Sequence, residues 1–187
     1  MVIPPKPRTV YYGTPRALPL VHAIALAGSF HYARCVRGLP PRDRHGRLLP
    51  RGSRDELAHD GEPEELVGSA QEACRRGIAL FDERRFFEAH EIFEYAWKAD
   101  DVDDRDRRFW KGVTQVAVGC CHAQRGNDRG ALALLERAAS HLQRFPSPYW
   151  GIDTTALISV ARSVTDQVRQ RGASASLDFP RFPTVGA

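Results

Sequence analysis

The amino-acid sequence predicts an all-α protein, a compact antiparallel bundle of about five helices that carries an irregular basic arm at its N-terminal end. From residue 63 onward, apolar residues recur at the three- and four-residue spacing of an amphipathic helix. No sustained alternation of apolar and polar residues, the pattern of a half-buried strand, occurs in the chain. Eight of the 13 prolines fall in residues 1–55, where they break helices and favour extended structure. These observations favour a bundle over a sheet protein.

The length and composition suit one soluble domain. The chain has 187 residues, of which 42% are hydrophobic, and this is enough for a packed core. No apolar run reaches the roughly 18 residues of a membrane helix, so we expect no membrane partner. A cytoplasmic location is expected because the cysteines suggest reduced thiols. The most apolar run, Ala17 to Gly28, contains Pro19 and ends in small residues like a signal peptide. A signal peptide, a disordered arm and a mispredicted start codon are therefore alternative interpretations of residues 1–33.

The composition divides the chain into three segments. Residues 1–55 are expected to form a basic, proline-rich and partly disordered arm, and residues 56–172 to form the helical bundle domain. Residues 173–187, which begin small and polar, are expected to form a flexible C-terminal tail. The four cysteines form no Cys-x-x-Cys pair, and adjacent Cys120 and Cys121 point to different helix faces. This argues against a structural zinc site and a disulfide framework.

Positive charge is concentrated in the arm. Residues 1–55 hold ten Lys or Arg and two Asp, a net charge of +8, whereas the other residues hold 17 basic and 21 acidic side chains, a net charge of −4. A basic arm on a mildly acidic body suits contact with nucleic acid or another anionic surface, and this is one hypothesis for residues 1–55. The part from Arg34 to Arg54 is expected to lie on the body. Its apolar anchors are expected to be Leu39, Leu48 and Leu49.

The first two helices are predicted from proline placement and periodicity. Pro63 suits the first position of a helix that runs to about Glu83. The second helix starts near Arg85, and counting 100° per residue gives it one apolar arc. The members of that arc are Phe86, Ala89, Phe93, Ala96 and Trp97. His90 lies inside the arc and Glu94 lies at its edge, so polar groups stand where a core should be apolar.

The third helix, about Arg105 to Gln124, is apolar almost all round and is therefore expected in the middle of the bundle. The aspartates before this helix are expected to cap its N-terminus. A calcium-binding loop explains them less well, because the central Gly and closing Glu of such a loop are missing. Gly112 and Gly119 leave room for a neighbouring helix. One face of this helix carries Lys111, Gln115 and His122, and because the helix is central this face is not expected to be simply exposed to solvent.

Two further helices follow. Gly126 suits a helix end and Asn127 an N-cap, so the fourth helix is expected to pack antiparallel to the third. Its core positions are Ala131, Leu134, Leu135, Ala138, Leu142 and Phe145. Asp153 is expected to cap the fifth helix, which ends at Gly172. Its core positions are Leu157, Ala161, Val164 and Val168.

Four short pieces resemble one known family. They are Phe87-Glu88-Ala89-His90-Glu91 with Glu94 and Trp97, Gly112 with Gln115, His122, and Gly126-Asn127 with Gly130-Ala131. Together they resemble the domain-of-unknown-function 309 family over roughly residues 63–171. The stretch from Pro41-Arg42-Asp43 to Pro50-Arg51-Gly52 is similar to an arm of its actinobacterial-type members. The resemblance implies an all-α bundle with no agreed function, and some members carry the label of predicted metal-dependent hydrolases.

The polar residues of the second and third helices form the candidate cluster. Its members are His90, Glu91, Glu94, Trp97, Gln115 and His122, and the adjoining turn and cap are Gly126, Asn127 and Gly130. In one interpretation His90, Glu94 and Gln115 satisfy one another as a buried hydrogen-bond network that sets the register of the bundle.

Two alternatives remain open for the same cluster. His90, Glu94 and His122 could bind a divalent metal whose water serves a hydrolase, or the cluster could line a metal-free ligand pocket. Neither the His-Glu-x-x-His motif nor paired Glu-x-x-His motifs are present to favour the metal. We therefore expect a non-catalytic or regulatory helical module, with the hydrolase and nucleic-acid binding as rivals. Homo-oligomerisation is left open.

Overall fold

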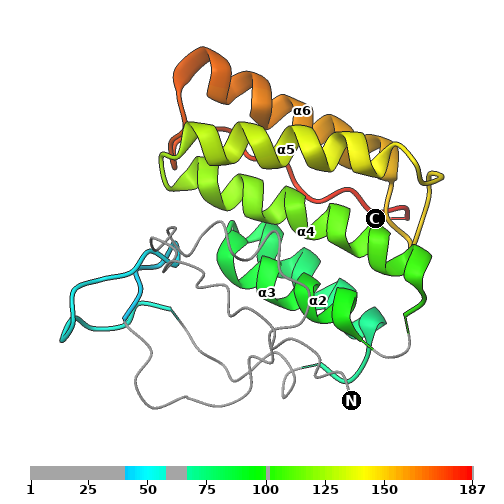
Figure 1. The fold of residues 1–187 in the computed structure, drawn as a ribbon, viewed down its shortest axis with the longest axis horizontal. Helices are drawn as coiled ribbons and strands as arrows, with labels where there is room; N and C mark the ends of the chain where they lie inside the picture. Colours follow the sequence, from blue (N-terminus) through cyan, green and yellow to red (C-terminus); the bar gives the residue numbers. More distant parts are fainter. Residues whose placement is uncertain (1–40, 58–66, 100–101, 187) are drawn as a thin grey trace, which may run out of the picture. The chain divides into compact units, whose positions relative to one another are not determined.

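The computed structural model describes residues 41–57, 67–99 and 102–186, and within these ranges the chain forms five helices and no strand beyond isolated bridges (Figure 1). The helices are α2 (Ala70–Asp82), α3 (Phe86–Lys98), α4 (Asp104–Gln124), α5 (Asp128–Leu142) and α6 (Thr154–Arg171). The predicted all-α fold is therefore confirmed. None of the described helices is both long enough and apolar enough to cross a membrane.

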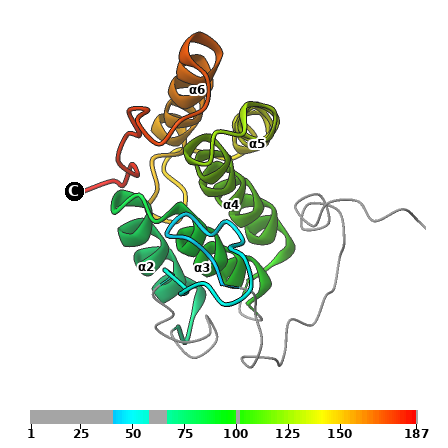
Figure 2. The same cartoon turned by 90° about the vertical axis from the view of Figure 1, so that its left-hand side faces the viewer.

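Helix α4 is the central element, as its all-round apolar sequence predicts. It packs against α3 on one side and α5 on the other, and it also contacts α6 (Figure 2). Its arc of Phe109, Val113 and Ala117 is fully buried, and so is Trp110 outside that arc. Asp103 caps its N-terminus by accepting a hydrogen bond from the Asp106 amide at 2.7 Å. The capping role expected of the aspartates is therefore confirmed for Asp103.

The two glycines of α4 permit the close approach of α5. A Cβ on Gly119 would lie 2.6 Å from Leu135 Cγ, and one on Gly112 would lie 2.8 Å from Leu142 Cδ2. A Cβ at either position would therefore force the leucine, or the helix that carries it, to shift. Leu135 and Leu142 of α5 occupy the space that the sequence predicts beside these glycines.

Helix α2 begins seven residues later than the predicted Pro63. Residues 58–66 lie outside the described part, but residues 67–69 are described and are not helical. The Ser69 hydroxyl accepts from the Glu72 amide at 3.2 Å, and the Glu72 carboxylate accepts from the Gly68 amide at 3.0 Å. This reciprocal arrangement closely resembles a capping box, whose Ser-x-x-Glu signature starts the helix at Ala70.

A tight turn links α2 to α3. The amide of Arg84 donates to Phe81 O and that of Arg85 donates to Leu80 O, both at 2.9 Å, which is a Schellman motif. Its left-handed position is taken by Arg84, with a φ of 61°, where glycine is usual. The Gln124 side chain donates to Arg84 O at 3.0 Å, so the turn is also tied to the C-terminal end of α4.

The C-terminal segment is a buried part of the core, unlike the expected flexible tail. Residues 173–186 run between α2 and α6 (Figure 2) and bury Leu177, Phe179 and Phe182. The Phe182 ring lies 5.2 Å from the Phe81 ring, and the Phe182 amide donates to the Asp82 carboxylate at 2.7 Å. The small polar residues at the start of the segment suggested mobility, but its phenylalanines fill space that the helices leave open.

The described part of the arm is a turn followed by an irregular segment. One oxygen of Asp43 accepts from the amides of His45 and Arg47, at 2.9 and 2.8 Å, and Gly46 has a φ of +75°. Leu48 is 55% exposed and anchors nothing, contrary to expectation, whereas Leu57 is buried. Leu39, with the signal-like run Ala17 to Gly28, lies outside the described residues.

Candidate functional site

His90 is buried on the apolar arc of α3, where the sequence places it. Its Nδ1 meets the carbonyl oxygen of Phe87, and because a carbonyl only accepts, the neutral ring donates from Nδ1. Burial lowers the pKa of His90 from 6.5 to about 4, against the opposing influence of Glu94. The imidazole is therefore neutral at physiological pH and is held by its own helix.

The other α3 members of the predicted cluster have different surroundings. Glu94 forms an ion pair with Lys98 one turn later at 3.0 Å, and acts on His90 only through its charge. Glu91 is half-buried, and its charge adds to the effect of burial, which is the main cause that raises the pKa of the Cys121 thiol. Trp97 is half-buried, and its backbone oxygen accepts from Arg107 at 3.2 Å.

On α4, Gln115 and His122 are both buried but serve separate regions. The Gln115 side-chain oxygen has no hydrogen-bond partner within the described part of the chain. The His122 Nδ1 lies 2.8 Å from the Asn127 side-chain nitrogen, at the turn into α5. His122 therefore belongs to the α4–α5 connection, two turns away from Gln115.

The Gly126, Asn127 and Gly130 unit is a capped turn that holds His122. Gly126 has a φ of 74°, and the Asn127 amide donates to His122 O at 2.9 Å, which completes a Schellman motif. The Asn127 side chain then accepts from the Gly130 amide at 2.9 Å as the N-cap of α5. A Cβ on Gly130 would lie 2.6 Å from His122 Nδ1, so the ring requires a glycine there.

The expected metal site is not assembled. Among residues 41–57, 67–99 and 102–186, no group of three or more His, Cys, Asp or Glu side chains could hold a metal ion. The alternative in which His90, Glu94 and His122 bind a metal is therefore not supported by the geometry of the described residues. His90 is bound to its own helix, Glu94 to Lys98, and His122 to the α5 cap.

The expected mutual network also differs from the structure. His90 and Glu94 each take a partner on α3, and the Gln115 oxygen takes none in the described part. Helical periodicity shows that these groups face inward, but the identity of a partner depends on the relative rotation and translation of two helices. That information is not contained in the spacing of residues along one helix.

The sequence predicts that the arm lies on the body, but it does not predict the contacts by which the arm docks on this face. The His45 carbonyl accepts from Arg125 Nε at 2.7 Å, the Cys121 thiol lies 3.8 Å from the same oxygen, and the Arg47 guanidinium donates to the Arg125 carbonyl. Gly46 is buried, and a Cβ there would lie 2.4 Å from Phe87 and Arg125 side-chain atoms. We call this contact, the Asp43–Arg47 turn on Phe87, Cys121 and Arg125, the arm-docking site.

Phe87 is the apolar centre of the arm-docking site. The Arg42 guanidinium lies 5.0 Å from its ring centroid and that of Arg125 lies 5.3 Å away, which is cation–π geometry. The His90 ring meets Phe87 at 4.9 Å in an edge arrangement. The sequence contains a signal for the turn of the arm, because Asp43-x-x-Gly46 suits a turn that starts with Asp and has glycine at a positive φ.

The electrostatics of the arm-docking site do not favour nucleophilic catalysis. Burial raises the pKa of Cys121 to about 11, although Arg125 acts in the opposite direction. Burial also raises the pKa of Cys120. Both thiols are therefore protonated at neutral pH, and a protonated thiol is a weak nucleophile. One Glu88 carboxylate oxygen and Arg125 Nη2 are buried without hydrogen-bond partners in the described part.

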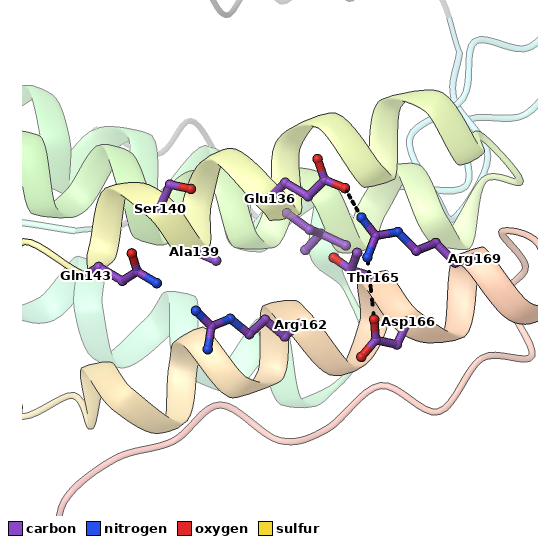
Figure 3. A pocket seen from close by; sticks show the side chains of 9 residues that line it. Glu136, Ala139, Ser140, Gln143, Arg162, Thr165, Asp166 and Arg169 are labelled. Carbon is purple, nitrogen blue, oxygen red and sulfur yellow. Dashed lines mark hydrogen bonds and ion pairs between the residues drawn. The ribbon is translucent and has the colours of Figure 1, made fainter.

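Away from the arm-docking site, a hollow of about 330 Å³ lies between α5 and α6 (Figure 3). Its charged side chains largely neutralise one another, because Arg169 pairs with Glu136 at 2.6 Å and with Asp166 at 3.7 Å. Arg162 extends into the same groove from α6. None of the residues predicted from the sequence to carry chemistry lines this groove.

The four motif pieces lie inside one segment of the chain that matches a known protein family. Residues 74–134 match the DUF309 family. The family is described as a domain of unknown function, and the match runs from α2 into α5. The resemblance inferred from the motif pieces is thus confirmed over the DUF309 segment. His90, Gln115, His122 and Asn127 lie inside it, whereas the described arm and the C-terminal segment lie outside.

One curated relative supports the same relationship. The chain is 34% identical over 99 residues to the Uncharacterized protein YpuF of Bacillus subtilis (strain 168). The aligned region is 52% of this chain and 56% of that protein, so the chain spans about half the length of the relative. The likeness adds no activity to the DUF309 segment.

Proposed function

We propose that this chain is a non-catalytic regulatory module in which the arm docks on α3 and α4 and controls access to that face. The observation that carries the proposal is the arm-docking site itself. The His45 carbonyl accepts from Arg125 Nε at 2.7 Å while Gly46 is packed on Phe87. Of the side chains considered above, His90 contacts the Phe87 ring of this site, and Cys121 lies beneath the His45 carbonyl.

The chemistry of the covered groups supports a structural role. His90 is neutral and donates to a carbonyl of its own helix, and Cys121 is protonated beneath the His45 carbonyl. Groups in these states stabilise an interface but are poorly suited to proton transfer or nucleophilic attack at neutral pH.

The test uses two glycines with matched backbone conformations. Gly46 and Gly52 both have positive φ values, +75° and +91°, but a Cβ on Gly52 meets nothing within 4 Å. The variants Gly46→Ala and Gly52→Ala therefore impose similar backbone strain, and only the first creates a clash with Phe87 and Arg125. The readout is the rate at which Cys121 in the native protein reacts with iodoacetamide, followed by peptide mass spectrometry.

We expect Gly46→Ala to raise the alkylation rate of Cys121 at least tenfold over both the parent and Gly52→Ala. Cys120 serves as an internal control because it is fully buried and is not a member of the arm-docking site, so its rate should not change. Circular dichroism confirms that the helices persist in both variants. Equal protection of Cys121 in the two variants would contradict the docking proposal.

A further inference from the structure

Arginines from three separate segments gather at the end of the bundle where the arm docks. The Arg47 guanidinium donates to the Arg125 carbonyl, and Arg44 adjoins His45, whose carbonyl accepts from Arg125. Gln124 holds the backbone of Arg84, and Arg129 follows Arg125 after one tight turn. We call this surface the arginine end, with the members Arg44, Arg47, Arg84, Arg125 and Arg129.

The arginine end is exposed and is not paired with acids. Arg44, Arg47, Arg84 and Arg129 are exposed, and none forms an ion pair with a carboxylate in the described part of the chain. Arg125 Nη2 is buried and has no hydrogen-bond partner among the described residues. The guanidinium groups of Arg44, Arg84 and Arg129 are thus available for an external anion, whereas those of Arg47 and Arg125 donate within the arm-docking site.

The acidic side chains of the same region already have other partners. Asp43 accepts from two amides of its own turn, and Asp128 accepts from the Ala173 amide at 2.6 Å. Glu83 and Glu88 both pair with Arg85. The Glu56 carboxylate accepts from the Arg44 amide at 3.2 Å. These carboxylates are thus bonded to backbone amides or to Arg85, whereas the exposed Arg44, Arg84 and Arg129 form no ion pair with a carboxylate in the described part.

We propose that the arginine end binds the phosphate backbone of duplex nucleic acid without reading its sequence. Guanidinium groups match phosphate geometry through paired hydrogen bonds, and several on one surface suit a regularly repeated anion. The described residues of the arginine end include no exposed aromatic ring on which the bases of a single strand could stack. A duplex is therefore favoured over a single strand.

A membrane surface is the weaker match. Stable attachment to anionic lipid needs inserted apolar groups beside the basic ones. Among the described residues the exposed large apolar side chains are Leu48 and Val185, and only Leu48 belongs to the arm. One leucine supplies little insertion, so the recognised group is the phosphodiester backbone of a duplex.

The binding experiment uses the full chain and a fluorescein-labelled DNA duplex of mixed sequence, followed by anisotropy at several salt concentrations. If about three phosphates are contacted, the affinity should fall roughly 40-fold between 50 and 200 mM salt. The variant Arg84→Gln/Arg129→Gln removes two arginines from the bundle part of the arginine end. It should weaken binding at least tenfold at 50 mM salt and flatten the salt dependence.

The matched control removes the same charge from another surface. Arg137→Gln/Arg162→Gln changes two exposed arginines of α5 and α6, and it should weaken binding less than threefold. Equal losses in the two double variants would overturn the assignment, as would binding that salt does not weaken. Failure to bind the duplex, with binding to vesicles of anionic phospholipid, would overturn it in favour of a lipid surface. Because Arg84 and Arg129 lie on the bundle, this outcome is separate from arm docking.

Discussion

Replacement of Phe182 by alanine tests whether the C-terminal segment is part of the core. The side chain is 5% exposed, and its ring lies 5.2 Å from that of Phe81 and 5.6 Å from that of Phe93. Truncation of a buried phenylalanine costs about 3–5 kcal/mol, because apolar burial is lost and a cavity remains. For a domain of this size, 1 kcal/mol corresponds to about 2–4 °C in Tm, so a decrease of roughly 6–20 °C is expected.

The assay is equilibrium unfolding in urea, followed by the helical circular dichroism signal. The matched control is Arg181→Ala, because the neighbouring side chain is exposed and its loss should change the free energy of unfolding by less than about 0.5 kcal/mol. A Phe182→Ala loss below about 1 kcal/mol would refute the reasoning, since a mobile tail contributes nothing to the folded state. Analysis by midpoint requires that the m value stays constant between variants.

Three further variants test the site and the turns. Folding lowers the pKa of His90 from 6.5 to about 4, so the unfolded chain binds a proton more readily than the folded chain between these pH values. The contribution of neutral His90 to the free energy of unfolding is therefore complete above pH 6.5. It is lost as the pH falls toward 4, by roughly 3 kcal/mol. His90→Gln should remove this part of the pH dependence of unfolding, and an unchanged dependence would contradict it. Gly119→Ala should destabilise the protein by about 1–3 kcal/mol in urea unfolding, because the new methyl group meets Leu135, and a neutral effect would show that the helices can separate. Arg84→Gly should stabilise it by about 0.5–1 kcal/mol by relieving a left-handed backbone, while weakening duplex binding; a lower Tm would oppose this.

Local sequence signals located most helices well. The structure starts α3 and α4 within one residue of the predicted positions, and places the expected caps at Asp103, Asn127 and Asp153. Such features are predictable because helical periodicity and capping depend on residues within one or two turns of each other. The close packing at Gly112 and Gly119 was predictable because a glycine inside a helix marks a place where a neighbouring helix can approach.

Two features differ from the predictions for different reasons. The start of α2 differs from the predicted Pro63, although the Ser69-x-x-Glu72 cap that begins the helix is a local signal. The burial of Phe179 and Phe182 is different, because it depends on contacts with Phe86 and Phe81, which lie far away in the sequence. Composition alone therefore suggested a mobile tail.

By itself, the sequence determined the helical class, the order of most elements and the inward direction of His90, Gln115 and His122. Only the tertiary structure decided their partners, and it separated the two histidines while bringing the arm onto Phe87 and Arg125. The physical reason is that a helix's own geometry sets which way a side chain points, whereas its partner is chosen by how separate elements pack.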